Sequence, residues 1–190
     1  GKDNSRAFLT RIGFDDPLQI ELPETIESNI PKTFSEVGAA TASFGHGLSI
    51  TPLHMAQAVA AFVNGGTLRP ATLFPRSDAE VDAVGKRVIS PETSERIRYL
   101  MRLNALEGSG THAKKLSDGY RVGGKTGTAE KVEDGRYVNN RNLNAFASTF
   151  PVDDPQYAMV ILVDEPKREN AQSGETAGWN AGEVTGRLIA

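Results

Sequence analysis

The arrangement of hydrophobic and polar positions predicts a long buried helix in the first half of the chain. The stretch SITPLHMAQAVAAFVNGG, residues 49–66, contains Thr51, a residue type that caps helices, followed by Pro52, which favours the first helical position. Gly65 or Gly66 ends the pattern. The apolar side chains cover a broad face, which indicates extensive burial: Leu53, Met55, Ala56, Val59, Ala60, Phe62 and Val63.

A second helix is predicted over residues 90–108. Ser90 is its expected cap, Pro91 leads it and Gly108 closes it. Its apolar stripe consists of Ile97, Leu100, Met101 and Leu103. The segment GSGTHAKKLSDG that follows is expected to be a glycine-bearing loop or a short helix.

From residue 120 the pattern changes to that of strands. Apolar or β-branched runs occur at 120–132, 144–151 and 157–166, separated by the turn dipeptide Asp134-Gly135, an Asn-rich loop and the turn DDPQ. Strands joined by turns and loops, rather than by helical crossovers, favour an antiparallel meander. The last stretch, TAGWNAGEVTGRLIA, is predicted to form a helix that covers one face of the sheet.

These elements together predict an α+β fold in which helices precede the sheet. The first fifty residues are rich in Pro, Gly and Asx, and we interpret them as mainly loops. The chain has 190 residues, the size of one domain, and no internal repeat divides it. We therefore interpret residues 1–190 as part of a single mixed domain.

Composition excludes several classes of function. The net charge is −3 and no polybasic run is present, which argues against a nucleic-acid partner. The absence of cysteine removes disulfides, thiolate catalysis and cysteine-ligated zinc, and no histidines have metal-ligand spacing, so neither a metal nor another cofactor is expected. The longest apolar stretches are too short to span a membrane, and the polar start GKDNSRAF is unlike a signal peptide.

The stretch GYRVGGKTGT, residues 119–128, admits two interpretations. From Gly119 to Thr126 it matches the P-loop pattern G-x-x-x-x-G-K-T, and Asp164-Glu165 after an apolar strand has the look of a Walker-B segment. A P-loop needs a buried strand before it and a long helix after it. The preceding THAKKLSD is too polar for such a strand, and Gly127 interrupts the expected helix, so we disfavour nucleotide binding. Asp164-Glu165 is more simply the start of a solvated loop.

The second interpretation makes the same residues an exposed strand beside a cleft. Lys125 and Gly127 then share one face, while Thr126 and Thr128 share the other. Lys125 supplies a fixed cation, the threonine hydroxyls can bind a carboxylate, and Gly127 lets a substrate backbone approach. The backbone N–H of Thr128 is a candidate oxyanion-hole donor.

GGKTGTAEK, together with ATASFGHGLSITPLHMAQAVAAFVNGGTLRP, resembles the transpeptidase domain of class B penicillin-binding proteins, in particular the septal, division-specific peptidoglycan transpeptidases. The resemblance runs from about Phe8 to the C-terminus. It implies a partial domain of the penicillin-binding, serine β-lactamase-like fold. It also implies D,D-transpeptidation, in which a serine attacks the D-Ala-D-Ala stem peptide and the acyl group passes to a neighbouring amine. β-Lactams would acylate the same serine.

Transferred to this sequence, the resemblance makes Lys125 and Thr128 catalytic residues, and Thr126, Gly127 and Thr128 the contacts to peptide or drug. It also requires S-x-x-K for the nucleophile and its lysine base, and S-x-N for proton shuttling. Neither motif occurs in residues 1–190, so the chain contains no candidate nucleophile. We expect it to be the C-terminal part of the transpeptidase domain, without the upstream S-x-x-K and S-x-N segments and inactive by itself.

The resemblance also implies location and partners. We expect the periplasmic face of the bacterial inner membrane, with an anchor outside this chain, and divisome membrane proteins as partners of the full-length protein. Loss of the missing part would expose apolar surface here, so self-association is expected. Two alternatives stay open: a non-catalytic module that binds a peptide or partner in the same groove, and the P-loop protein.

Several other residues invite a functional interpretation but have simpler ones. His46, between two glycines, is expected in a turn near the cleft rim, and His54 and His112 show no ligand spacing. Trp179 opens the C-terminal helix and is expected to pack. The stretch Tyr137–Asn144 shapes the groove or forms a solvated loop, and the sequence favours neither.

Overall fold

The helix predicted near the middle of the first half is α3, which spans Pro52–Val63 in the computed structural model of the chain. Thr51 caps it as expected, because its hydroxyl accepts a hydrogen bond from the His54 amide at 3.2 Å. The structure describes residues 1–133, 136–168 and 170–190. They form two compact units, Gly1–Pro91 and Glu92–Ala190, and each has its own hydrophobic core.

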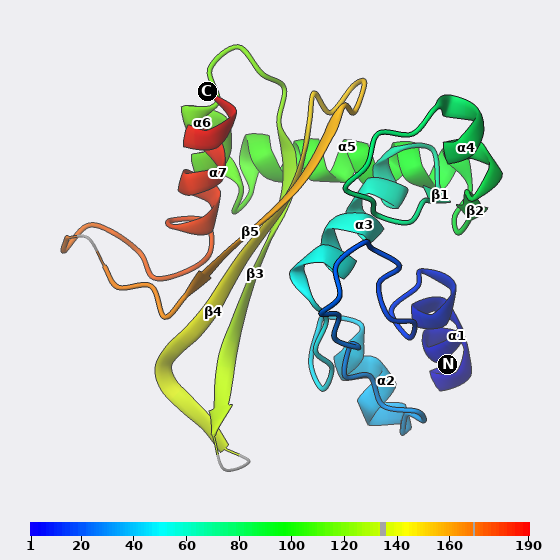
Figure 1. Ribbon diagram of the computed structural model, residues 1–190. Coiled ribbons are helices and arrows are strands. Elements are labelled where there is room, and N and C mark those ends of the chain that lie inside the picture. The colour runs from blue at the N-terminus through cyan, green and yellow to red at the C-terminus, as the bar shows by residue number, and fades with distance from the viewer. Residues whose placement is uncertain (134–135, 169) are drawn as a thin grey trace. The chain divides into compact units, whose positions relative to one another are not determined.

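The regular structure of the first unit is mainly helical (Figure 1). Its core lies between α3 and the loops around it and includes Ile12, Phe14, Ala58, Ala61 and Val88. The segments Thr67–Leu68 and Lys86–Arg87 pair as antiparallel strands, and Leu68 packs against this core. Its elements are α1 (Lys2–Arg11), α2 (Glu36–Ala42), α3, β1 (Thr67–Leu68), α4 (Asp78–Ala83) and β2 (Lys86–Arg87).

The prediction that the first fifty residues are mainly loops is wrong at two places, where α1 and α2 form. Helix α1 contains no fully buried residue. A helix of this kind needs only a weak apolar stripe, and its sequence gives little sign of it. Helix α2 is a two-turn helix with one buried residue, Ala39, and Ser35 caps it by accepting from the Gly38 amide. Short helices with little buried surface leave little periodic signal in a sequence.

The second unit carries an antiparallel sheet in the strand order β3-β4-β5, as the turn pattern predicts. Figure 1 shows the strands crossed by α5 on one side and flanked by the neighbouring helices α6 and α7 on the other. The elements are α5 (Pro91–Glu107), α6 (Thr111–Leu116), β3 (Gly123–Glu133), β4 (Arg136–Phe150), β5 (Tyr157–Asp164) and α7 (Ala181–Ile189).

Phe146, on the central strand β4, is the centre of this second core. It is fully buried against Ala113 of α6 and Ala181 of α7, with Ile161 and Val163 of β5 beside it. The helices approach closely because small residues lie between them: a Cβ atom at Gly186 would lie 2.6 Å from the Ala113 carbonyl oxygen. The predicted cover of one sheet face by the C-terminal helix is therefore confirmed.

Two local predictions in this unit are wrong. The Asn-rich stretch between Tyr137 and Asn144 is part of β4 and not a loop. Leu100 is 59% exposed, although its spacing placed it on the buried stripe of α5; the residues that α5 buries are Ser94, Met101 and Ala105. Met101 lies next to β3, since a Cβ atom at Gly123 would be 3.2 Å from the Met101 Cβ. The predicted turn at residues 134–135 lies outside the described residues.

Candidate functional site

The K-T-G residues lie on β3, at an edge of the sheet, as the second interpretation of residues 119–128 predicts. Strand alternation separates Lys125 and Gly127, on one face, from Thr126 and Thr128 on the other. Lys125 is exposed, and its Nζ donates to the Thr126 carbonyl oxygen at 2.6 Å. An edge strand offers unpaired backbone groups to an added chain, so this segment is accessible to a ligand backbone.

The three glycines of this strand differ in what surrounds them. A Cβ atom at Gly123 would lie 2.8 Å from Val152 Cγ2, and one at Gly124 would lie 2.4 Å from Phe146 Cζ. Internal packing therefore requires both. At Gly127 the nearest described atom would be the Ala145 Cβ, at 3.8 Å, which is ordinary contact distance. Packing within the described residues does not require glycine at 127, so a function that keeps this surface open explains it better.

Each threonine hydroxyl of the motif is held by a different segment of the chain. Thr126 Oγ1 lies 2.5 Å from Ser109 Oγ, in the turn between α5 and α6. Thr128 Oγ1 accepts a hydrogen bond from the Ala177 amide at 3.1 Å, just before α7. Because an amide supplies the proton in the second contact, the Thr128 hydroxyl keeps its own proton for another acceptor.

Asn144, the cross-strand neighbour of Thr128, fixes the segment that holds this hydroxyl. Its fully buried side-chain amide donates to the Glu175 carbonyl oxygen at 2.6 Å and to Asn180 Oδ1 at 3.0 Å. The same Asn180 oxygen caps α7 through the Ala181 amide at 2.7 Å. The sequence names Asn144 only as the end of the stretch Tyr137–Asn144, and it gives no signal for Ser109 or Ala177, because neither belongs to a motif and each acts through contacts distant in sequence.

Comparison with known proteins agrees with this geometry. The sequence model described as "Penicillin binding protein transpeptidase domain" matches residues 1–185. The chain belongs to this family. It is 39% identical, over 96% of its length, to "Probable peptidoglycan D,D-transpeptidase FtsI" of Caulobacter vibrioides, and 36% identical, over 97%, to "Stage V sporulation protein D" of Bacillus subtilis.

Solved structures of the penicillin-binding protein family share the fold. The transpeptidase domain of Burkholderia pseudomallei penicillin-binding protein 3 matches 96% of this chain with a TM-score of 0.84 and 30% identity. Penicillin-binding protein 3 of Mycobacterium tuberculosis, solved in complex with ampicillin, matches with a TM-score of 0.82 and 25% identity. This chain spans 32% and 30% of the two curated relatives and 54% of the Burkholderia structure.

The P-loop interpretation is wrong for a member of this family. Gly119 lies in a turn with a φ of +81°, after the short helix α6, and no strand leads into it. β3 begins at Gly123 and continues to Glu133, so a strand occupies the place where a phosphate-binding helix would start. The amides of Lys125 and Thr126 therefore belong to a sheet and not to a helix N-terminus.

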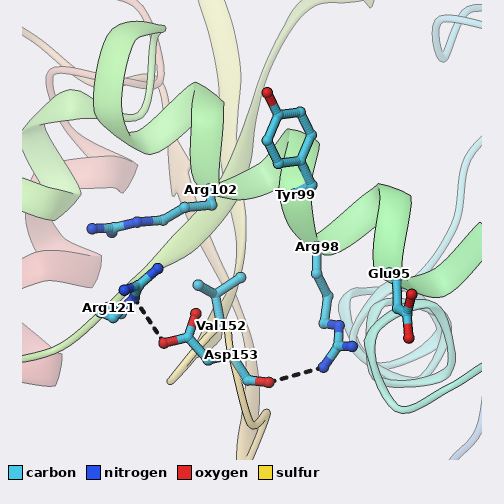
Figure 2. A pocket seen from close by; sticks show the side chains of 7 residues that line it. All are labelled: Glu95, Arg98, Tyr99, Arg102, Arg121, Val152 and Asp153. Carbon is cyan, nitrogen blue, oxygen red and sulfur yellow. Dashed lines mark hydrogen bonds and ion pairs between the residues drawn. The ribbon is translucent and has the colours of Figure 1, made fainter.

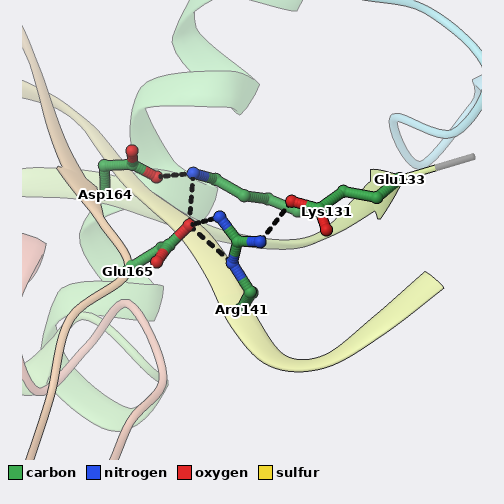
Figure 3. A network of polar contacts seen from close by, with 5 residues as sticks. All are labelled: Lys131, Glu133, Arg141, Asp164 and Glu165. Carbon is green, nitrogen blue, oxygen red and sulfur yellow. Dashed lines mark hydrogen bonds and ion pairs between the residues drawn. The ribbon is translucent and has the colours of Figure 1, made fainter.

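The acidic pair Asp164 and Glu165 lies at the end of β5, as predicted, but it is also the centre of an ion-pair network with residues of β3 and β4 (Figure 3). Lys131 Nζ lies 2.6 Å from Asp164 Oδ1 and 2.8 Å from Glu165 Oε1. Arg141 donates to the same Glu165 oxygen through Nε at 2.8 Å and Nη2 at 2.5 Å, and it also pairs with Glu133. The network connects all three strands at one end of the sheet.

Hydrogen bonds from Arg141, and next from Lys131, lower the pKa of Glu165 from 4.5 to about 2. Glu165 also adopts a φ of +46°, in the left-handed region that non-glycine residues seldom occupy, so the network holds an unfavourable backbone conformation. A lowered folded-state pKa means that the ionised carboxylate stabilises the fold above pH 4.5. This contribution is lost as the pH falls from about 4.5 towards 2.

We expect Glu165→Gln to lower the urea midpoint of unfolding at pH 7, because the amide cannot pair with Arg141 and Lys131 as an anion. The difference from the unsubstituted chain should shrink at pH 2.5, where the carboxylate begins to protonate. Urea titrations followed by circular dichroism at the two pH values measure both effects. Glu107→Gln, at an exposed position of α5, serves as the control. A difference that stayed constant with pH would contradict the assignment.

A surface cavity of about 230 Å³ lies on the second unit, and none of the K-T-G residues lines it. Figure 2 shows that its arginines point towards the turn after β4 and the chain before β3. The Asp153 carbonyl oxygen accepts a hydrogen bond from Arg98 Nη1 at 3.1 Å, and the Asp153 carboxylate forms an ion pair with Arg121 Nε at 2.7 Å. Arg102 Nη1 donates to the Val122 carbonyl oxygen at 2.9 Å. Arg98 and Arg102 thus connect α5 to the segments that flank the sheet, and Arg121 connects those two segments to each other.

His46 and His54 behave as expected where the structure tests them. His46 lies in a turn between glycines with positive φ. His54 is buried and structural: its Nε2 donates to the Asp16 carbonyl oxygen at 2.9 Å, and its Nδ1 accepts from Thr51 at 2.8 Å. Trp179 differs from its prediction, because it lies in the turn before α7 and not in the helix. Its ring contacts the His112 ring, with 4.2 Å between centroids, and 43% of the residue is exposed.

Residues 1–133, 136–168 and 170–190 contain no group of three or more His, Cys, Asp or Glu that could bind a metal ion. Within the same residues, no helix combines the length and the apolar character needed to cross a bilayer.

Proposed function

We propose that residues 1–190 form the C-terminal part of the transpeptidase domain of a peptidoglycan D,D-transpeptidase. The longer polypeptide, which would carry these residues behind an S-x-x-K segment, cross-links D-Ala-D-Ala stem peptides during septal wall synthesis and is acylated by β-lactams. The relatives' names and the structure with ampicillin support this activity. The proposal places the protein on the periplasmic face of the inner membrane, with divisome proteins as partners and the nucleophilic serine outside this chain.

The observation that carries the proposal is the open surface at Gly127, inside a K-T-G-T strand at a sheet edge. A stem peptide or a β-lactam would lie along this edge, and its carboxylate would meet the hydroxyls of Thr126 and Thr128. Lys125 supplies positive charge beside the reacting serine, and the Thr128 N–H stabilises the oxyanion that forms during attack. These roles rest on the family motif and on the placement of the residues.

A fluorescent penicillin tests the activity. We expect the longer polypeptide to be labelled with a stoichiometry near one, and the label to disappear when the S-x-x-K serine is replaced. Lys125→Ala should slow labelling by a factor of about 100 or more, because the site loses a fixed charge. Residues 1–190 alone, which lack the nucleophile, are the matched negative control. An unlabelled longer polypeptide would leave the non-catalytic peptide-binding module as the better explanation.

A further inference from the structure

The Thr126 hydroxyl has a neighbour whose hydrogen bonds determine which way its proton points. Ser109 Oγ lies 2.5 Å from Thr126 Oγ1 and 3.2 Å from Asn104 Oδ1. The Asn104 amide orientation is fixed because its Nδ2 donates to the Gly124 carbonyl oxygen at 2.8 Å. Its Oδ1 can only accept, so the proton on Ser109 points to Asn104. Ser109 therefore accepts the proton of Thr126 in this structure.

The position of Ser109 is determined by its surroundings. The turn wraps around Asn104: a Cβ atom at Gly108 would lie 2.4 Å from Asn104 Oδ1, and the amides of Gly108 and Gly110 both donate to the Asn104 carbonyl oxygen. On the other side, a Cβ atom at Gly178 would lie 2.5 Å from the Ser109 carbonyl oxygen. Close backbone approaches on both sides hold the Ser109 hydroxyl beside β3.

The two threonines of the motif thus differ in whether their hydroxyl proton is available to an anion. Thr128 accepts from an amide and can donate its proton outwards. Thr126 already donates to Ser109 and presents lone pairs, which repel a carboxylate. When a carboxylate binds at Thr126, the hydrogen bond between Thr126 and Ser109 changes direction. Thr126 then donates its proton to the ligand, and Ser109 donates its proton to Thr126 instead of to Asn104. A hydroxyl that accepts one hydrogen bond donates the next more strongly.

We propose that Ser109 is a positioning residue, which orients and strengthens the Thr126 hydroxyl as a donor to the terminal carboxylate of the peptide or drug. The inference rests on the proposed function, since it needs a ligand carboxylate at the K-T-G strand. Ser109 forms no contact with the reacting carbonyl in this scheme. Its effect is limited to ligands that carry the carboxylate.

Acylation kinetics of the longer polypeptide test the inference. We expect Ser109→Ala to slow acylation by a peptide thioester with a free terminal carboxylate three- to tenfold, about the effect of one neutral hydrogen bond. The same thioester with an amidated terminus should react within twofold of the unsubstituted protein. Ser109→Thr, which keeps the hydroxyl, should restore the rate with the free carboxylate. Unfolding midpoints verify that the variants are folded.

A double-mutant cycle with Thr126→Val separates positioning from a structural effect. If Ser109 acts through Thr126, Ser109→Ala has no further effect once Thr126 is valine. An equal loss in both backgrounds, an equal loss with both thioesters, or an unchanged or faster rate for Ser109→Ala alone would overturn the inference but not the proposed function. If the unsubstituted longer polypeptide does not react at all, both fail.

Discussion

Gly127→Val is expected to reduce acylation of the longer polypeptide by a fluorescent penicillin at least about 100-fold while the sheet stays folded. The valine side chain would project from the open surface of β3 and block a ligand backbone from the strand edge. Losing two or more ligand hydrogen bonds produces an effect of this size. Valine is well suited to a strand, so the fold itself should tolerate the change.

Gly124→Ala is the matched control on the same strand. Its Cβ atom would lie 2.4 Å from Phe146 Cζ and 2.9 Å from the Ala147 carbonyl oxygen, so this smaller substitution should lower the free energy of unfolding. Labelling rates and urea midpoints are measured on both variants. Gly127→Val should lower mainly the labelling rate, whereas Gly124→Ala should lower mainly the urea midpoint. If Gly127→Val destabilised the chain as much as Gly124→Ala, the glycine at 127 would have a structural explanation and would no longer support the function.

Phe146→Ala should lower the free energy of unfolding by about 3–5 kcal/mol, the usual cost of truncating a fully buried aromatic residue. The ring fills the space between β4 and the helices α6 and α7, and small residues around it cannot expand into the cavity. Urea unfolding of the 190-residue chain measures the change. Tyr99→Ala, on α5 with 67% of the tyrosine exposed, should change it by less than about 1 kcal/mol. Equal losses would contradict this account of the second core.

The parts of the fold that the sequence predicts are those with local signals. Thr51 and Pro52 define the start of α3 because a cap and a first-turn proline act within a few residues. The K-T-G strand follows from the change of period and from the poor surroundings for a P-loop. The antiparallel order follows from turns between consecutive strands.

The missed features depend on contacts between distant residues. The Asn-rich stretch becomes part of β4 because Asn144 is buried against the Glu175 carbonyl oxygen, and because Arg141 pairs with Glu165. Neither partner is visible from the local pattern, which contains asparagines but no strand period. The prediction for Leu100 is wrong for a related reason. Helical spacing identifies the apolar face of α5, but it does not tell which residues of that face the rest of the fold will bury.

The candidate site also contains residues that the sequence predicts and residues that it does not. The motif itself identified Lys125, Thr126, Gly127 and Thr128, and their roles stay predictions. The motif gave no indication of Ser109 or Ala177, because a hydroxyl and a backbone amide acquire meaning only beside the threonines that they contact. Residue type at these two positions is not constrained by any spacing rule.

The attachment of the two threonine hydroxyls to separate segments has an evolutionary consequence. If the longer polypeptide has the proposed function, selection that alters its affinity for an antibiotic need not change the four-residue motif, whose substitution would also impair the proposed reaction. Changes near Ser109 adjust one hydroxyl, and changes near Ala177 adjust the other. Under the proposed function, drug tolerance would therefore have two routes that a survey of the motif alone would overlook.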